Sequence, residues 1–146
     1  MSAHPPDFSA AARLPYGTRR VSRARAAIAE AASEMRGAFT AERLHERVAR
    51  EHPGIGLATV YRAVAAMTEA GYLARVGARD GAALYAVCAS EEHHHHAVCE
   101  SCGAVAPVAC TLVRAALPPG FAVTHHELAI YGMCADCARR SGEVGA

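Results

Sequence analysis

The sequence predicts an α+β fold made of two small units. Apolar residues recur every three or four positions in three consecutive segments between residues 21 and 71, and two short β-rich segments follow before residue 88. The remaining part holds five of the six cysteines and six of the nine histidines. A chain of 146 residues can bury two small cores, which usually need a metal ion or a second chain for stability.

The first predicted helix carries an apolar stripe: Val21, Ala24, Ile28, Ala31 and Met35. This is the spacing of an amphipathic helix, and we expect it to end by Gly37. The second helix is predicted to begin after Thr40, a suitable N-cap with Glu42 in the first turn, and to run to about Glu51. The third is expected to end at Gly71. Its inner face carries Leu57, Val60, Val64 and Met67.

Residues 72–76 and 83–87 are predicted to form two strands around a turn rich in Gly, Arg and Asp. Three helices and a hairpin are the order of a winged helix-turn-helix, whose third helix enters the major groove of DNA. Thr59, Tyr61 and Arg62 face away from its apolar stripe, where Arg and Tyr can meet bases or phosphates. The alternative is a packing domain in which Tyr61 only covers the core.

A net charge of +1 conceals an asymmetry on either side of Cys88. The residues up to it carry twelve arginines against eight acidic residues, and those after it carry three against six. This distribution suggests an anionic partner for the first part and a metal ion for the second. No run of apolar residues approaches a membrane span and no export signal is evident, so we expect a soluble, cytoplasmic protein.

Two CxxC pairs, separated by thirty-one residues, give the strongest chemical signal in the chain. Each pair can turn both sulfurs toward one ion, as a closed tetrahedral zinc site requires. The predicted structural zinc ligands are Cys99, Cys102, Cys134 and Cys137. Two disulfides would be the alternative, but they require an oxidising compartment.

Four histidines precede the first pair, and side chains alternate along an extended segment. His93 and His95 would share one face, and His94 and His96 the other. One tract can therefore supply two metal sites, each completed by other residues. A solvated histidine run is the alternative.

Several motifs closely resemble those of the ferric uptake regulator (Fur) family. The segment Gly56–Arg62, with the sequence GLATVYR, resembles the family's recognition helix, and the His tract before CxxC strengthens the match. The match also includes the stretch that leads to the second CxxC, in the segments Gly120–His126 and Ile130–Gly132. The resemblance spans about Val21 to Cys137, nearly the whole chain.

This resemblance implies a homodimeric, metal-dependent transcription regulator. An N-terminal winged helix-turn-helix domain would comprise residues 21–88, and a small C-terminal α/β dimerisation domain with the structural zinc would comprise residues 93–140. A basic, flexible arm (1–20), a hinge (89–92) and a tail (141–146) would complete the chain.

The partner implied is double-stranded DNA carrying an AT-rich inverted repeat. Tyr61 and Arg62 match the family's base-contacting pair, Thr59 lies beside them, and Arg20 falls where the family often has a basic residue that reaches the minor groove.

The resemblance also places a regulatory metal at the hinge. Cys88 matches a thiolate of the zinc uptake regulator (Zur) branch, whereas the iron-sensing branch's usual His and Glu correspond to Ala38 and Ala86. Cys88 with His94 and His96 suits Zn²⁺ better than the oxygen-rich sets that Mn²⁺ prefers.

The fourth ligand of this site is open. Zur-like proteins have an Asp at the position of Ala74, and Asp80, Glu91, Glu92 or water could replace it.

A possible further metal site consists of His93, His95, His126 and Cys110. The three histidines match family ligands, but the usual acidic ligand corresponds to Arg114. Cys110 would lie one helical turn earlier and could substitute for it, unless it is a buried apolar residue. His125 and Glu127 are further candidates.

These features together predict a zinc-responsive repressor of metal-uptake genes, with zinc as co-repressor. The alternatives within the family are sensors of Fe²⁺, Mn²⁺ or peroxide, and a metal store or chaperone without DNA binding lies outside it. We expect no enzyme, and no small-molecule ligand other than metal ion. The chain has no HExxH motif and no HxE paired with PCxxC, which zinc hydrolases and deaminases require.

Overall fold

The computed structural model describes residues 14–88, 93–110 and 117–142. The N-terminal unit has the predicted order of elements: α1 (Arg23–Glu34), α2 (Ala41–Ala49), α3 (Leu57–Glu69), β1 (Leu73–Arg79) and β2 (Ala82–Val87). The two strands form an antiparallel hairpin. This arrangement is a winged helix-turn-helix within an α+β fold.

The helices begin where side chains cap them. Ser22 and Thr40 accept hydrogen bonds from backbone N–H groups three residues later, at 3.2 Å in both cases. The predicted stripe of α1 is buried at Ile28 and Ala31, whereas Val21 is exposed because it precedes the cap. The second helix is shorter than predicted, since it ends at Ala49.

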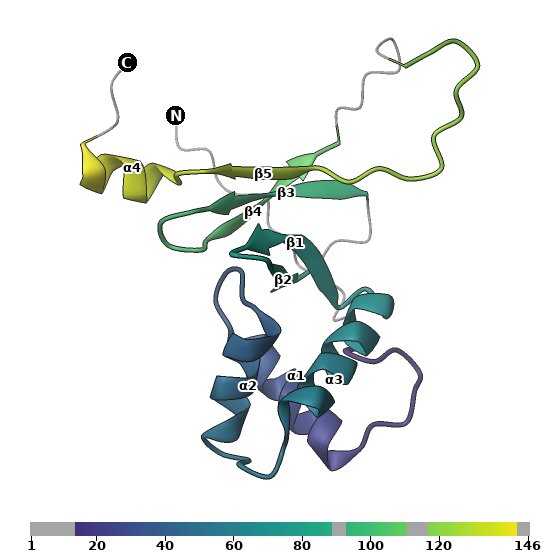
Figure 1. Ribbon diagram of the computed structural model, residues 1–146, viewed down its shortest axis with the longest axis vertical. Helices are drawn as coiled ribbons and strands as arrows, with labels where there is room; N and C mark the ends of the chain where they lie inside the picture. The colour runs from purple at the N-terminus through teal and green to yellow at the C-terminus, as the bar shows by residue number, and fades with distance from the viewer. Residues whose placement is uncertain (1–13, 89–92, 111–116, 143–146) are drawn as a thin grey trace.

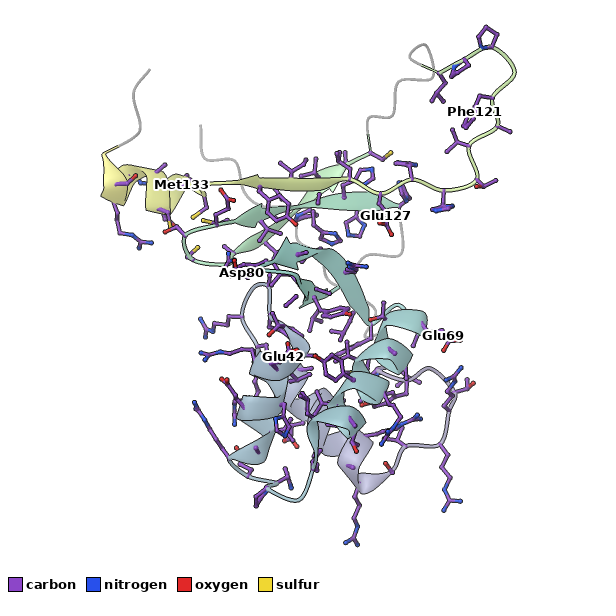
Figure 2. The ribbon with its side chains drawn as sticks, in the orientation of Figure 1. Glu42, Glu69, Asp80, Phe121, Glu127 and Met133 are labelled. Carbon is purple, nitrogen blue, oxygen red and sulfur yellow. The ribbon has the colours of Figure 1, made fainter. Side chains whose placement is uncertain are left out.

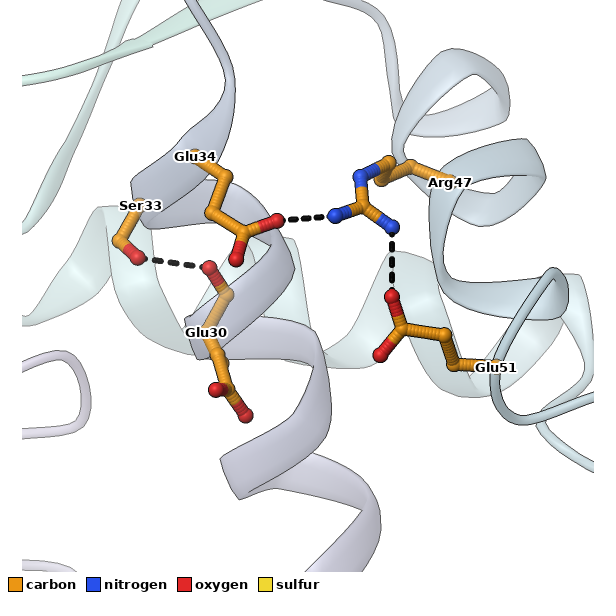
Figure 3. A network of polar contacts seen from close by, with 5 residues as sticks. All are labelled: Glu30, Ser33, Glu34, Arg47 and Glu51. Carbon is orange, nitrogen blue, oxygen red and sulfur yellow. Dashed lines mark hydrogen bonds and ion pairs between the residues drawn. The ribbon is translucent and has the colours of Figure 1, made fainter.

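Ionic contacts also connect the first two helices. Arg47 of α2 pairs with Glu34 of α1 and with Glu51 (Figure 3). Both carboxylates are at least half exposed, so solvent screens these pairs and they stabilise the contact between the helices only weakly. The main stabilisation therefore comes from the apolar core, whose largest fully buried side chains are Ile28, Leu44, Val48, Val60, Val64, Met67 and Leu73.

Asp80 and Gly81 form the tight turn of the hairpin (Figure 2). Both have positive φ angles, 51° and 80°. This backbone matches the twist of two antiparallel strands, which explains the Asp-Gly pair.

The C-terminal unit consists of β3 (His94–Cys99), β4 (Val105–Ala109), β5 (Ala129–Gly132) and α4 (Ala135–Ser141). The strand order is β4-β3-β5, with β3 antiparallel to β4 and parallel to β5. Residues 117–128 run as an extended segment away from the sheet, and Phe121 lies exposed on it (Figures 1 and 2).

A second apolar cluster joins the two units. Val76, Leu84 and Ala86 of the hairpin pack with Val98 of β3, and the hairpin lies against the three-stranded sheet (Figure 1). Metal ligands that flank this contact can therefore connect the two units. Among the described residues, none of the helices has the length and apolar character that a membrane span requires.

Candidate metal centres and nucleic-acid face

Three groups of His and Cys side chains gather in the C-terminal unit and at its contact with the hairpin. Within each group, one potential ligand atom per residue lies within 4.8 Å of all the others. The groups are Cys99, Cys102, Cys134 and Cys137; Cys88, His94 and His96; and His93, His95, Cys110 and His126. The sequence-predicted ligands thus come together in the predicted sets.

The four-cysteine group is assembled by strand pairing. Cys99 ends β3 and lies opposite Gly132, the end of β5. The second CxxC follows at once, with Cys134 as the N-cap of α4 and Cys137 inside it. The two motifs therefore meet at one end of the sheet, which the thirty-one-residue spacing could not show by itself.

Distances within this group fit a zinc ion. Cys102 Sγ and Cys134 Sγ are 3.8 Å apart, and sulfur ligands about 2.3 Å from a tetrahedral ion lie about 3.8 Å from one another. No disulfide joins any of the six cysteines, all of which lie within the described residues. Donation from the Cys134 backbone N–H, at 3.3 Å, is the main reason that the pKa of Cys99 falls to about 6. Such a thiol readily becomes the thiolate that binds metal.

The second group lies between the two units. Cys88 follows β2, and its N–H donates to Tyr72 O at 2.9 Å. Its Sγ lies 3.5 Å from His94 Nε2, which is 3.0 Å from His96 Nε2. Burial, followed by His94, lowers the pKa of His96 and favours the neutral imidazole that metals require. A cavity of about 370 Å³ adjoins the three donors.

The described residues supply three donors to this group. Ala74 pairs with Ala86 in the hairpin and offers only a methyl group. Asp80 occupies the turn, at the opposite end of the hairpin from Cys88 (Figure 2). Glu91 and Glu92 lie outside the described residues.

The third group surrounds His126. Its Nε2 lies 3.0 Å from His93 Nε2, 3.0 Å from His95 Nε2 and 3.1 Å from Cys110 Sγ. His95 is buried, and this burial, followed by His126, lowers its pKa.

The sheet register explains the position of Cys110. His94 pairs with Ala109 at the end of β4, which places the next residue beside the histidines. The helical relation expected between Cys110 and Arg114 falls on residues 111–116, outside the described residues. His125 and Glu127 are not members of the group.

The candidate nucleic-acid face is the outer surface of α3. Tyr61 is 47% exposed and Arg62 is also exposed, with Arg62 Nη2 donating to Thr59 Oγ1 at 3.1 Å. Tyr61 donates its hydroxyl hydrogen to Glu42 at the start of α2, a partner that periodicity does not indicate (Figure 2). Arg20 is exposed just before α1.

A family model, known protein sequences and solved structures all relate this chain to the same group of proteins. The family model described as "Ferric uptake regulator family" matches residues 17–131. The zinc uptake regulation protein of Mycobacterium tuberculosis (strain H37Rv) is 37% identical over 123 residues, covering 81% of this chain and 94% of that protein. The ferric uptake regulation protein of Cupriavidus metallidurans is 36% identical over 109 residues, covering 70% and 76% respectively.

Two solved structures are also similar. A zinc uptake regulator complexed with zinc and DNA has a TM-score of 0.67 and 26% identity, with 84% of this chain and 86% of that chain covered. The ferric uptake regulator of Vibrio cholerae, described as showing rearranged DNA-binding domains, has a TM-score of 0.57 and 28% identity, with 79% and 92% covered.

Proposed function

The chain belongs to the ferric uptake regulator family, and from this premise we propose that it is a zinc-responsive repressor that binds operator DNA as a homodimer. Members of this family are metal-responsive transcriptional regulators and not enzymes. The observation that carries the choice of zinc is the group of Cys88, His94 and His96 between the two units. The zinc uptake regulation protein and the zinc and DNA complex support the same choice.

The donor chemistry distinguishes zinc from the other metals sensed in this family. One thiolate and two imidazoles form a soft to intermediate set, whereas Mn²⁺ favours carboxylate and carbonyl oxygens. Ala38 and Ala86, at the positions where the iron-sensing branch has ligands, offer none. Iron sensing is the second candidate, because a ferric uptake regulation protein is 36% identical to this chain.

The three donors belong to different units, which suggests how metal controls DNA binding. Cys88 is attached to the hairpin, and His94 and His96 to the sheet. A bound zinc ion would supply a cross-link between them. These side chains would then restrain the winged-helix unit and preorganise the recognition helices of the two protomers. Shifting such an equilibrium from mostly open to mostly closed takes about 5.5 kcal/mol of difference between the zinc affinities of the two arrangements, and the open arrangement would lack the ligand from the opposite unit.

The remaining ligands have separate proposed roles. Cys99, Cys102, Cys134 and Cys137 would hold a structural zinc that stabilises the C-terminal dimerisation domain, for which we propose residues 93–140. The group around His126 would hold a further ion, with Cys110 in place of a carboxylate.

DNA recognition is proposed for the winged-helix domain, residues 21–88. Tyr61 and Arg62 would contact base edges of an AT-rich inverted repeat, with Thr59 beside them and Arg20 directed toward the minor groove. The target genes would encode metal uptake.

The test uses dimer that keeps its structural zinc but has been stripped of exchangeable metal by a chelator, together with a duplex that the zinc-loaded wild-type protein selects from a random-sequence pool. Fluorescence anisotropy then measures binding as free Zn²⁺, Fe²⁺ or Mn²⁺ is varied. We expect zinc to induce binding at the lowest free concentration, and Cys88→Ser to abolish that response while the dimer persists. Cys110→Ser makes the same change in the group around His126, and a comparison of the two variants separates the effects of the two metal groups. Full response of Cys88→Ser to zinc, or induction by Fe²⁺ alone, would contradict the proposal.

A further inference from the structure

A direct polar contact that uses no metal ligand links the two units. The hydroxyl of Tyr131 in β5 accepts a hydrogen bond from Ala78 N at 2.7 Å and donates one to Ala78 O at 3.3 Å. The two residues are 53 positions apart in the sequence. One phenol of the sheet thus binds both backbone groups of one residue in the hairpin.

The hairpin is shaped to receive this phenol. The pairing of β1 with β2 shifts between Arg75 and Gly77, immediately before Ala78. A Cβ atom at Gly77 would lie 2.0 Å from Tyr131 Oη and 2.7 Å from its Cζ. Any residue other than glycine at position 77 would collide with the phenol of Tyr131. The position of Tyr131 therefore explains why the hairpin has a glycine here.

Two further polar contacts lie along the same boundary. Ala38 N donates to Gly103 O at 2.8 Å, and Arg79 Nη2 donates to Glu100 O at 3.2 Å. Gly37 is held equally close, since a Cβ there would lie 2.3 Å from Gly103 O. Together with the apolar cluster around Val98, these contacts orient the hairpin against the sheet without any metal ligand.

The described chain as a whole is similar to a zinc uptake regulator complexed with zinc and DNA. A TM-score over both units depends on how the units are placed relative to each other. It is higher with the zinc and DNA complex than with the structure whose DNA-binding domains are rearranged.

We infer that Tyr131 is a positioning residue for DNA binding, whose phenol fastens the hairpin to the dimerisation sheet and lowers the zinc concentration needed to bind the operator. This inference rests on the proposed function, because it concerns the domain arrangement that zinc is proposed to stabilise. Part of the free energy that favours the closed arrangement comes from contacts within the protein, and bound zinc supplies the remainder.

The decisive variant is Tyr131→Phe, which keeps the ring and removes both hydrogen bonds. We expect the zinc concentration for half-maximal binding of the selected duplex to rise about five- to tenfold, the effect of one or two partly exposed hydrogen bonds. Tyr16→Phe is the matched control, because it removes a tyrosine hydrogen bond within the N-terminal unit, to Arg25 O. It should leave the zinc response unchanged.

A second variant tests the same contact from the other side. Gly77→Ala should also raise the zinc requirement, and combining it with Tyr131→Phe should add less than the product of the two separate effects, because both changes disrupt one contact. Fully multiplicative effects would overturn the assignment to this contact.

Small-angle scattering of zinc-loaded dimer without DNA separates this inference from the proposed function. Tyr131→Phe should increase the radius of gyration, with the dimer mass unchanged. An unchanged radius of gyration together with a wild-type zinc response would overturn the role of Tyr131. A larger radius of gyration in a protein whose wild type shows no zinc-dependent DNA binding would retain the contact and reject zinc sensing.

Discussion

Raising the pH should destabilise the N-terminal unit through one buried phenol. Tyr16 is only 2% exposed, and its hydroxyl donates to Arg25 O at 2.7 Å. Burial is the main cause that raises the pKa of Tyr16 to about 12, from an ordinary value of 10.0. The neutral phenol is therefore favoured in the folded state.

The sign and size of the effect follow from linkage. The contribution of Tyr16 is complete below pH 10, where both states are protonated, and is lost as the pH rises toward 12, because the unfolded chain ionises first. Between about pH 9 and about pH 11 the free energy of unfolding should fall by about 1.3 kcal/mol from this residue alone.

Other groups also titrate in this range, so the comparison is between wild type and Tyr16→Phe. The variant lacks the hydrogen bond and should be about 1 kcal/mol less stable near pH 9. Near pH 11 the two should be about equally stable, since wild type has lost about 1.3 kcal/mol that the variant keeps. The stability of the two proteins is measured at both pH values by urea unfolding of the zinc-loaded dimer, followed by circular dichroism at one fixed protein concentration. A difference that stays constant across this pH range would refute the reasoning.

Three further predictions concern metal and DNA. Cys99→Ser should lose one tightly bound zinc per chain, which is measured by competition with a chelator. The loss should unfold the C-terminal unit or dissociate the dimer. Retention of both the zinc and the dimer would reject the structural site. Arg62→Ala should weaken binding to the selected duplex by about 1–3 kcal/mol in anisotropy titrations, and should weaken binding to an unrelated duplex less, since only the lost positive charge acts there. Glu42→Gln keeps an acceptor for Tyr61 but removes a negative charge from the proposed DNA face. Its binding to an unrelated duplex should therefore be stronger than that of wild type at low salt and equal to it at high salt. Equal affinities at low salt would contradict this role of Glu42.

Local signals explain how much of the fold was predictable. Thr40 is the N-cap that the sequence predicted, and Gly71, with φ of 75°, closes the third helix. Alternation along an extended tract predicted that His94 and His96 share a face. Each of these depends on neighbours within a few positions, which a single sequence displays.

Contacts between distant segments were not predictable in the same way. Tyr16 was assigned to a basic arm, yet it is buried in the first core. The position of Cys110 follows from the register of β4 against β3, and the bond between Tyr131 and Ala78 follows from how the two units are placed. Such features depend on tertiary packing, which periodicity does not encode.

Strand β3 and the residue before it contribute to all three metal groups. His93 and His95 serve one group, His94 and His96 another, and Cys99 the third. Because side chains alternate strictly along a strand, inserting a single residue between His96 and Cys99 would reverse the facing of the histidines relative to the four-cysteine group. A substitution at one of these positions would therefore disturb a single metal group, whereas a change in the length of the strand would disturb all three.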